Sequence, residues 1–379
     1  MSQRTFMMLA GEASGDALAA ELVHALKKTD GGLEFFGAGG AKMRAAGVEV
    51  EIDLTEHAVI GIWEALRNYS KFKGFFDRLL DAAAVRQPET VILVDNPGFN
   101  LRFAAALRDR ALAASGWNPR IVQYISPQLW AWNESRVYGI ARDIDLLLSI
   151  FPFEKAWYAE RAPWLNVEFV GHPLVDRHPN PQGANPDGEP TLLILPGSRE
   201  KEITRHLPVM AGAVRHLSRN MDFSVRMVLP NEKLAAMAKA IAPEVTDWEL
   251  QTSDLSSALE GATSAIASSG TVTMECAWFR VPTVVLYKTS WPTYLLGRCF
   301  IKVPHIAMPN VLAGGELFPE FIQGGATAEN LAMASRGFLQ NPSHANDLRS
   351  SLDEVAATLG EKGAVNRAAR AVLKCLESA

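Results

Sequence analysis

The sequence predicts an α/β protein of two doubly wound domains, each a parallel sheet with helices on both faces. Apolar runs of strand length alternate with stretches of helical spacing in both halves of the chain. A segment rich in proline and glycine, residues 176–190, separates the halves as a linker. Glycine- or serine-rich loops follow several strands, as in sheets that bind nucleotides. We expect the two domains to face each other across a cleft.

These features set the expected domain boundaries. The first domain covers residues 1–175 and the second covers residues 191–344. The tail, residues 345–379, contains two amphipathic helical patterns, which we expect to complete the first domain.

Composition limits the functional classes. The 379 residues are 48% hydrophobic and 21% charged, as in soluble globular proteins. A net charge of −5 argues against a general nucleic-acid binder. Cys276, Cys299 and Cys375 are widely spaced and lack histidine companions, so we expect reduced thiols in a cytoplasmic chain and no metal site. The apolar runs are too short for a signal peptide or a membrane span, so any membrane contact is expected to be peripheral.

The stretch 192–210 has the pattern of a strand, a phosphate loop and a helix. An apolar run, Leu192–Leu195, ends at Pro196-Gly197, and helical spacing follows. Amides in such a loop favour an anion, and Arg199 adds a bidentate phosphate partner. An ordinary connection with an exposed arginine is the alternative. The helix begins either near Arg205, with Pro208 in its first turn, or near Glu200, with a kink.

The amino-terminal strand is followed by a loop of similar design. Residues 5–10 read as a strand, and Glu12 and Ser14 lie in the glycine-flanked loop after it. These polar residues are interpreted either as ligand contacts or as helix caps. Residues 35–40 predict a second glycine-rich turn.

A third apolar strand, residues 91–94, ends at Asp95. Catalytic groups meet ligands at the carboxyl ends of parallel strands, so Asp95 is the candidate general base. The alternative role is an Asx-turn ahead of Pro97.

In the second half, Ser268–Thr271 opens a helix that carries Glu275. Small residues let backbone amides approach a phosphate, and a carboxylate one turn later suits a ribose diol. Residues 304–315 are rich in glycine and proline and are expected to form a loop.

Residues 57–76 combine large apolar side chains with Arg67, Lys71 and Lys73. Such a helix either lies on an anionic membrane and contacts acyl chains, or packs in the core with a basic edge. The candidate membrane or acyl-chain residues are Ile62, Trp63, Leu66, Tyr69 and Phe72.

Eight motifs occur in one order along nearly the whole chain. They are LAGEASGD (9–16), DNPGFN (95–100), YISPQLWAWNESR (124–136), FPFEKAWY (151–158), FVGHPL (169–174), ILPGSR (194–199), SSGTVTMEC (268–276) and MPNVLAG (308–314). Together they resemble those of the lipid-A-disaccharide synthases, inverting glycosyltransferases of family 19 with the GT-B fold of two Rossmann-like domains.

The resemblance implies a reaction and its substrates. UDP-2,3-diacylglucosamine would donate its sugar to the 6-hydroxyl of 2,3-diacylglucosamine 1-phosphate, releasing UDP. It also implies a protein that is peripheral on the cytoplasmic face of the inner membrane, without a metal or other cofactor. Homodimers that exchange carboxyl-terminal segments are expected as well.

The resemblance also implies roles for individual residues. Asp95 would be the base, and Arg199 would stabilise the departing diphosphate. The further assignments are Ser198, Ser269, Gly270 and Thr271 for the diphosphate, Glu275 for the ribose, Asn310 for the nucleotide or diphosphate, and Glu12 and Ser14 for the acceptor.

One position departs from the family pattern. Many members have a second acid where Gly98 stands, which weakens a scheme with paired carboxylates and leaves a single base intact. Two other functions are weighed: an enzyme like UDP-N-acetylglucosamine 2-epimerase, and a relative that binds nucleotide sugar or lipid without turnover.

Overall fold

The computed structural model describes residues 4–55, 69–114, 116–181 and 189–377. The chain forms two compact units. The first consists of Met1–Arg177 and Leu359–Ala379, and the second of His178–Thr358.

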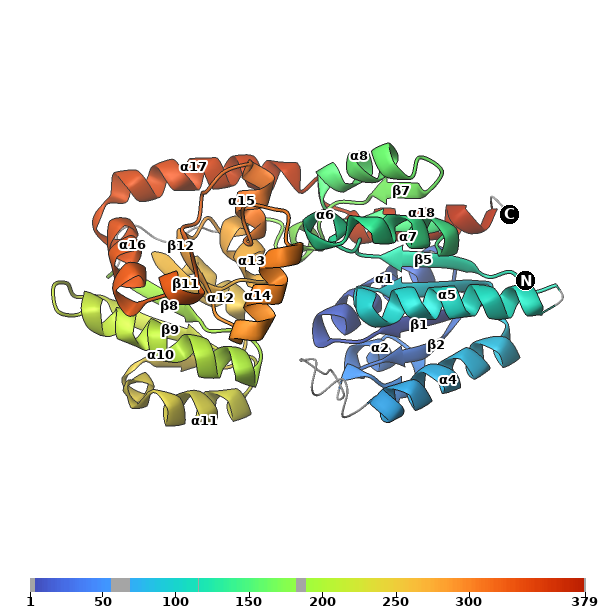
Figure 1. The fold of residues 1–379 in the computed structure, drawn as a ribbon, viewed down its shortest axis with the longest axis horizontal. Helices are drawn as coiled ribbons and strands as arrows, with labels where there is room; N and C mark the ends of the chain where they lie inside the picture. The colour runs from blue at the N-terminus through green and yellow to red at the C-terminus, as the bar shows by residue number, and fades with distance from the viewer. Residues whose placement is uncertain (1–3, 56–68, 115, 182–188, 378–379) are drawn as a thin grey trace. The chain divides into compact units, whose positions relative to one another are not determined.

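The first unit is built on a seven-stranded parallel sheet in the order β3-β2-β1-β4-β5-β6-β7 (Figure 1). Its strands are β1 (Arg4–Ala10), β2 (Leu33–Gly39), β3 (Val48–Asp53), β4 (Thr90–Val94), β5 (Arg120–Tyr124), β6 (Leu146–Ser149) and β7 (Asn166–Phe169). Its helices are α1 (Ala13–Thr29), α2 (Ala41–Ala45), α4 (Tyr69–Arg86), α5 (Pro97–Ala113), α6 (Leu129–Trp132), α7 (Val137–Asp143), α8 (Pro152–Arg161), α9 (Pro173–Arg177) and α18 (Ala364–Glu377).

The central strands are apolar on both sides because helices cover both faces of the sheet. All five residues of β4 are buried, and Leu9 of β1 and Leu93 of β4 pack in one core cluster with Phe103 of α5. The carboxyl-terminal helix α18 packs against α1, although the two helices are more than three hundred residues apart in the sequence (Figure 1). Asp176 fixes the approach to this helix by accepting a hydrogen bond from the main-chain N–H of Val365 at 3.0 Å.

The second unit is built on a six-stranded parallel sheet in the order β10-β9-β8-β11-β12-β13. Its strands are β8 (Thr191–Leu195), β9 (Ser224–Val228), β10 (Glu249–Gln251), β11 (Ser264–Ser268), β12 (Thr283–Tyr287) and β13 (Glu320–Ile322). Its helices are α10 (Glu200–Leu217), α11 (Glu232–Ile241), α12 (Leu255–Glu260), α13 (Val272–Trp278), α14 (Trp291–Phe300), α15 (Met308–Ala313), α16 (Ala328–Gln340) and α17 (Pro342–Thr358).

The predicted class, two doubly wound parallel-sheet α/β domains, is confirmed. The first division between the units falls within the predicted linker 176–190. The second falls at Leu359, so α17 belongs to the second unit, whereas the sequence placed residues 345–379 with the first.

Two local predictions were wrong. Residues 35–40 were expected to form a turn, but most of them belong to strand β2. Gly37 lies so close to β1 that a Cβ atom there would come within 2.2 Å of the carbonyl oxygen of Met8. The glycine therefore marks a close approach of two strands. Residues 304–315 were expected to be a loop, but they contain α15.

The structure shows which of the two predicted starts of helix α10 is correct. It begins at Glu200 and contains Pro208, which has no N–H to donate to the carbonyl of Thr204. Of the basic, aromatic stretch 57–76, residues 57–68 lie outside the described residues, and α4 begins at Tyr69. None of the described helices is long and apolar enough to cross a membrane.

Candidate functional site

The order of strands in the first unit makes β1 and β4 neighbours at a switch point. The chain runs from β1 outward to β2 and β3, and then returns to the other side of β1 as β4. Ligands of open parallel sheets bind beyond the carboxyl ends of the strands at such a point. Glu12 follows β1 and Asp95 follows β4, so both predicted residues stand at this position.

The backbone at Asp95 has an uncommon conformation that neighbouring groups hold in place. Asp95 and Asn96 have φ angles of 51° and 40°, in the left-handed region. The N–H of Asp95 donates to the carbonyl oxygen of Tyr124 at 2.9 Å. Its own carbonyl oxygen accepts hydrogen bonds from Nδ2 of Asn100 at 2.8 Å and from Nε2 of Gln123 at 3.1 Å. The carboxylate therefore projects from a braced turn.

The loops after β1 and β4 pack directly on each other. A Cβ atom at Gly11 would lie 2.0 Å from Nδ2 of Asn96, so a larger residue would displace the Asn96 side chain. This contact explains the glycine at the start of the first loop and links Glu12 to the loop of Asp95.

The two acidic residues of the first loop, Glu12 and Asp16, differ in whether they cap a helix. Asp16 is buried, and its carboxylate accepts hydrogen bonds from the main-chain N–H groups of Gly40, Lys42 and Met43 at 2.7 to 3.1 Å, so it fixes the start of α2. Glu12 stands at the N-cap of α1, but its side chain makes no capping hydrogen bond there. Ser14 is exposed in the first turn of α1. Glu12 and Ser14 thus keep the acceptor-binding assignment as a proposal.

A buried acid supports the loop that follows β5. Nε1 of Trp130 donates to Oε1 of Glu154 at 3.2 Å, and the N–H of Phe151 donates to Oε2 at 3.4 Å. Burial raises the pKa of the Glu154 carboxyl to about 8, although these hydrogen bonds act in the opposite direction. Glu154 therefore ties α8 to the tryptophan-bearing helix α6 as a neutral group at pH 7.

The second unit repeats the switch-point design between β8 and β11, which are neighbours in its sheet. Ser198 and Arg199 follow β8, and Ser269, Gly270 and Thr271 follow β11. The structure thus brings both predicted phosphate loops to one edge. Ser198, Gly270 and Thr271 are exposed. Ser269 differs, because its N–H donates to the carbonyl oxygen of Leu286 at 3.2 Å and its hydroxyl to that of Ile306 at 3.3 Å.

A carboxylate of the chain already engages the first phosphate loop. The N–H of Ser198 donates to Oε2 of Glu202 at 3.0 Å, and Nη1 of Arg199 lies 3.4 Å from Oε1. A Cβ atom at Gly197 would come within 2.4 Å of the same carboxylate. The loop thus holds an anion at the start of α10, as helix amino termini favour. Sequence reasoning missed Glu202.

His206 joins two loops of this edge and was also missed. Its buried ring accepts a hydrogen bond at Nε2 from the N–H of Lys288 at 3.1 Å, which leaves Nδ1 to donate to the carbonyl oxygen of Pro196 at 2.9 Å. Burial lowers the pKa of His206, so the ring stays neutral and keeps this tautomer. The signal was its place on the apolar face of α10, beside Ile203 and Leu207.

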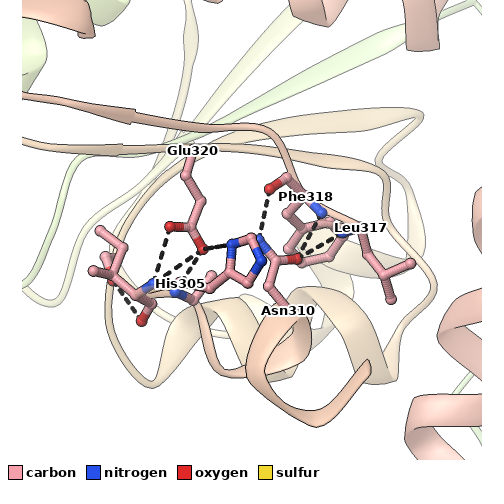
Figure 2. A network of polar contacts seen from close by, with 8 residues as sticks. His305, Asn310, Leu317, Phe318 and Glu320 are labelled. Atoms are coloured by element: carbon pink, nitrogen blue, oxygen red, sulfur yellow. Dashed lines mark hydrogen bonds and ion pairs between the residues drawn. The ribbon is translucent and has the colours of Figure 1, made fainter. Parts of the chain in front are cut away.

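Asn310 makes its full set of hydrogen bonds inside the protein, as Figure 2 shows. Nδ2 donates to the carbonyl oxygen of Phe318 and to Oε1 of Glu320, both at 2.8 Å. Oδ1 accepts from the N–H groups of Leu317 and Phe318 at 2.9 and 2.8 Å. Two donors and two lone pairs are thus in use. This arrangement suits a residue that positions the surrounding loops.

The sequence analysis missed Glu320. Its carboxylate accepts hydrogen bonds from the side-chain amide of Asn310 and from the main-chain N–H groups of Ile306 and Ala307. The carboxylate is nearly buried, and Nδ1 of His305 lies 4.0 Å from Oε1 (Figure 2). The carbonyl oxygen of Ile306 accepts a hydrogen bond from the hydroxyl of Ser269, so the network extends to the second phosphate loop. Glu275 lies half-buried in α13, just beyond that loop.

Ile62, Trp63 and Leu66 lie outside the described residues, while Tyr69 begins α4. Phe72 is partly exposed, with its ring 6.2 Å from that of Phe75 in an edge-to-face arrangement. Among the residues that the structure describes, no group of three or more His, Cys, Asp or Glu side chains is arranged to hold a metal ion. Burial raises the pKa of the Cys276 thiol to about 12.

Solved structures of similar fold cover nearly the whole chain. An S. aureus MnaA structure with UDP has a TM-score of 0.66 at 15% identity, covering 99% of this chain and 97% of that one. A UDP-GlcNAc 2-epimerase from Neisseria meningitidis bound to UDP-GlcNAc has a TM-score of 0.61 at 12% identity, covering 98% and 100%. The glycotransferase of kitacinnamycin has a TM-score of 0.59 at 15% identity, covering 99% and 100%. These likenesses place the chain in the GT-B fold.

Sequence relatives are more specific. The lipid-A-disaccharide synthase of Myxococcus xanthus (strain DK1622) is 37% identical over 387 residues, covering 98% of this chain and 97% of the relative. That of Geobacter sulfurreducens is 35% identical over 384 residues, with the same coverage. The family model described as lipid-A-disaccharide synthetase matches residues 6–375. The chain belongs to the lipid-A-disaccharide synthetase family.

Proposed function

We propose that this enzyme joins two acylated glucosamines into the disaccharide of lipid A. It transfers 2,3-diacylglucosamine from its UDP derivative to the 6-hydroxyl of 2,3-diacylglucosamine 1-phosphate and releases UDP. Membership of the family supports the reaction. The observation that carries the assignment of residues is the place of Asp95 at the β1/β4 switch point and of Arg199 at the β8/β11 switch point.

The reaction is one in-line displacement at C1 of the donor sugar. The carboxylate of Asp95 takes the proton from the 6-hydroxyl as the oxygen attacks, and the electron pair of the breaking C1–O bond passes to the leaving UDP. Asp95 suits this role because the main chain that carries it is fixed on both sides by hydrogen bonds. The proposed base therefore needs little reorganisation before transfer.

The leaving diphosphate gains one negative charge as the C1–O bond breaks, and fixed donors must stabilise that charge. Arg199 supplies a guanidinium, and the loops of Ser198, Gly270 and Thr271 present exposed small residues. The ligand replaces Glu202 as the anion of the first loop. Ser269 shapes the second loop through its hydrogen bonds to Leu286 and Ile306.

Glu275 holds the ribose hydroxyls, and Glu12 and Ser14 hold the acceptor sugar. Asn310 acts on the nucleotide through the loops that it positions, because its amide is occupied within the protein. The proposed reaction needs no metal, and chelator-treated protein should therefore keep its activity.

The assignment is tested with purified protein, both lipid substrates and detergent micelles, following UDP and disaccharide by mass spectrometry. The Asp95→Asn variant should bind UDP nearly as the wild type does, while turnover falls at least about 100-fold, a usual loss for a general base. Asp109→Asn, an exposed acid on α5, is the matched control. Near-normal turnover of Asp95→Asn would remove the base assignment.

The same preparation tests the two other functions. The fold is shared with UDP-GlcNAc 2-epimerases, so formation of the 2-epimer from UDP-GlcNAc alone would favour an epimerase. Binding of UDP without disaccharide would favour a relative without turnover.

We also propose the assembly and location that the family implies: a homodimer with exchanged carboxyl-terminal segments, peripheral on the cytoplasmic face of the inner membrane. Light scattering measures the dimer. For the membrane contact of residues 57–76, replacing Trp63 and Phe72 with serine should reduce liposome association more than thermal stability. The reverse pattern would mark both as core residues.

A further inference from the structure

Helix α14, which belongs to the second unit (Figure 1), leaves large apolar side chains in solvent. Trp291 is 63% exposed and Phe300 is 58% exposed. The apolar surface of α14 is made of Trp291, Leu295, Leu296, Phe300 and Ile301, which directly follows the helix. Exposed apolar residues gathered on one element mark an interaction site, whereas scattered ones need no explanation.

The body of the second unit does not account for these side chains. No residue of α14 is buried, and only Tyr294 and Gly297 are partly covered. The ring of Tyr294 meets that of Trp291 edge-to-face at 5.8 Å, so even this contact lies within the helix. The helix is nevertheless well formed at its start, where the hydroxyl of Ser290 accepts a hydrogen bond from the N–H of Thr293 at 3.4 Å.

The charged residues in the sequence around α14 have one sign. Residues 289–315 contain Arg298 and Lys302 and no aspartate or glutamate, in a chain where acidic residues exceed basic ones by five. Arg298 and Lys302 are both exposed. Tryptophan, phenylalanine and leucine beside exposed cations are the composition of helices that lie in the interface of an anionic membrane.

The position of α14 also relates it to the ligand edge. The helix begins four residues after the end of β12, and Lys288 in the connection is bonded to His206, which supports the first phosphate loop. Helix α14 therefore follows the sheet at the edge where the nucleotide sugar is proposed to bind.

We propose that the apolar surface of α14 inserts into the interface of an anionic phospholipid bilayer. This inference rests on the proposed function, which requires a donor whose acyl chains reside in a membrane. Trp291, Leu295, Leu296 and Phe300 enter the acyl boundary, and Arg298 and Lys302 pair with lipid phosphates. It assigns the second unit a membrane contact of its own, distinct from residues 57–76.

Cys299 provides a direct probe, because it is exposed on α14 whereas Cys276 is buried. A polarity-sensitive fluorophore is attached to Cys299 in a Cys375→Ser background. Vesicles of phosphatidylcholine with 30% phosphatidylglycerol are then added to the full-length protein without substrate. The emission should shift to the blue and be quenched by lipids spin-labelled in the acyl chain. The matched control carries the fluorophore on Met333→Cys, an exposed apolar position on α16, in a Cys299→Ser, Cys375→Ser background.

A shift at position 299 with none at position 333 supports the proposal. An unchanged probe at position 299 while the protein co-sediments with vesicles would overturn it, because another surface would then carry the binding. An equal response to vesicles of phosphatidylcholine alone would overturn the requirement for anionic lipid.

A second variant tests the same surface without a label. Leu295→Ser, Leu296→Ser and Phe300→Ser together should lower the vesicle partition coefficient at least about tenfold, with an unchanged unfolding temperature, since none of the three is buried. The Met333→Ser variant should bind as the wild type does. A loss of oligomer mass in the triple variant would reassign the surface to a contact between copies and overturn the proposal. None of these measurements uses turnover, so a failure of the proposed reaction is read separately in micelles.

Discussion

The side-chain amide of Gln123 donates a hydrogen bond to the main-chain oxygen of Asp95, with an Nε2–O distance of 3.1 Å. The same nitrogen lies 3.1 Å from the carbonyl oxygen of Ile125, a β-branched residue with a φ of 71°. Left-handed backbone is costly at such a residue. One buried amide thus braces the ends of two neighbouring strands, β4 and β5.

Gln123→Met keeps the length of the side chain and removes its N–H donors. Buried carbonyl oxygens lose partners, so the free energy of unfolding should fall by about 1–3 kcal/mol. Because Asp95 would lose its fixed position, kcat should fall about tenfold while the KM for the UDP-sugar stays within twofold. Gln128→Met, exposed in the next loop, should leave both values unchanged. An unaltered kcat in Gln123→Met would show that the other hydrogen bonds are sufficient.

Glu202→Gln should strengthen UDP binding. The carboxylate occupies the first phosphate loop, so a diphosphate must displace a like charge. Removing that charge should lower the Kd for UDP about threefold to tenfold by calorimetry, while α10 loses about 0.3–1 kcal/mol of amino-terminal stabilisation. Glu200→Gln changes an exposed acid of the same helical turn and serves as the control. Weaker binding in Glu202→Gln alone would mean that Glu202 orients Arg199 for the ligand.

Stability should fall between pH 6.5 and 8 because of Glu154. Its folded pKa of about 8 exceeds the usual value, so the folded chain holds more protons than the unfolded chain in this range. Stability is therefore fully present at acid pH and is lost as pH rises, by about 2 kcal/mol over this window.

Two buried histidines do not interfere with this measurement. Burial lowers the pKa of His172, to about 4, and that of His206. Their contributions to stability rise with pH through the unfolded-state pKa near 6.5, opposite in sign to that of Glu154, and they are the same in wild type and variant. Glu154→Gln should therefore flatten the loss in urea unfolding between pH 6.5 and 8. An identical slope in wild type and variant would place the titrating group elsewhere.

Gly98 tests whether one carboxylate is enough. It is the second residue of α5, and a Cβ atom there would meet nothing within 4 Å. Gly98→Ala should stabilise the protein by about 0.5–1 kcal/mol, because glycine is unfavourable in a helix. Gly98→Asp should fold equally well and change kcat less than about twofold if Asp95 acts alone. A tenfold rise in kcat, absent in Gly98→Ala, would support paired carboxylates.

The sequence predicted the positions of those candidate residues that depend on local order. Asp95 directly follows β4 and Arg199 lies four residues after the end of β8, so a parallel sheet places both candidates at the carboxyl edges of their sheets. Strand β2 was missed because Gly37 reads as a turn residue. The glycine is needed there because the carbonyl group of Met8, far away in the sequence, leaves no room for a Cβ atom. Helix α15 was missed because Pro309 and Gly314 mark the two ends of a helix only six residues long.

Gln123, His206 and Glu320 escaped prediction for a different reason. Each is a polar residue within or beside an apolar pattern, and its role depends on partners that only the tertiary fold supplies. Gln123 meets a carbonyl 28 positions away, and His206 meets an amide 82 positions away. Periodicity contains no information on such pairs.

The place of α18 at the end of the chain determines when the first unit can be completed. It completes the first unit by packing on α1, and Arg367 holds it through a hydrogen bond of 2.8 Å to the carbonyl oxygen of Val170. The second unit is continuous in the sequence, so all its residues are added to the chain before α18 is made. Domains usually mature in the order of their translation. Here the half that is translated first cannot be completed until the last residues are made, and a chain that ends before Ala364 lacks a helix of the first unit but none of the second.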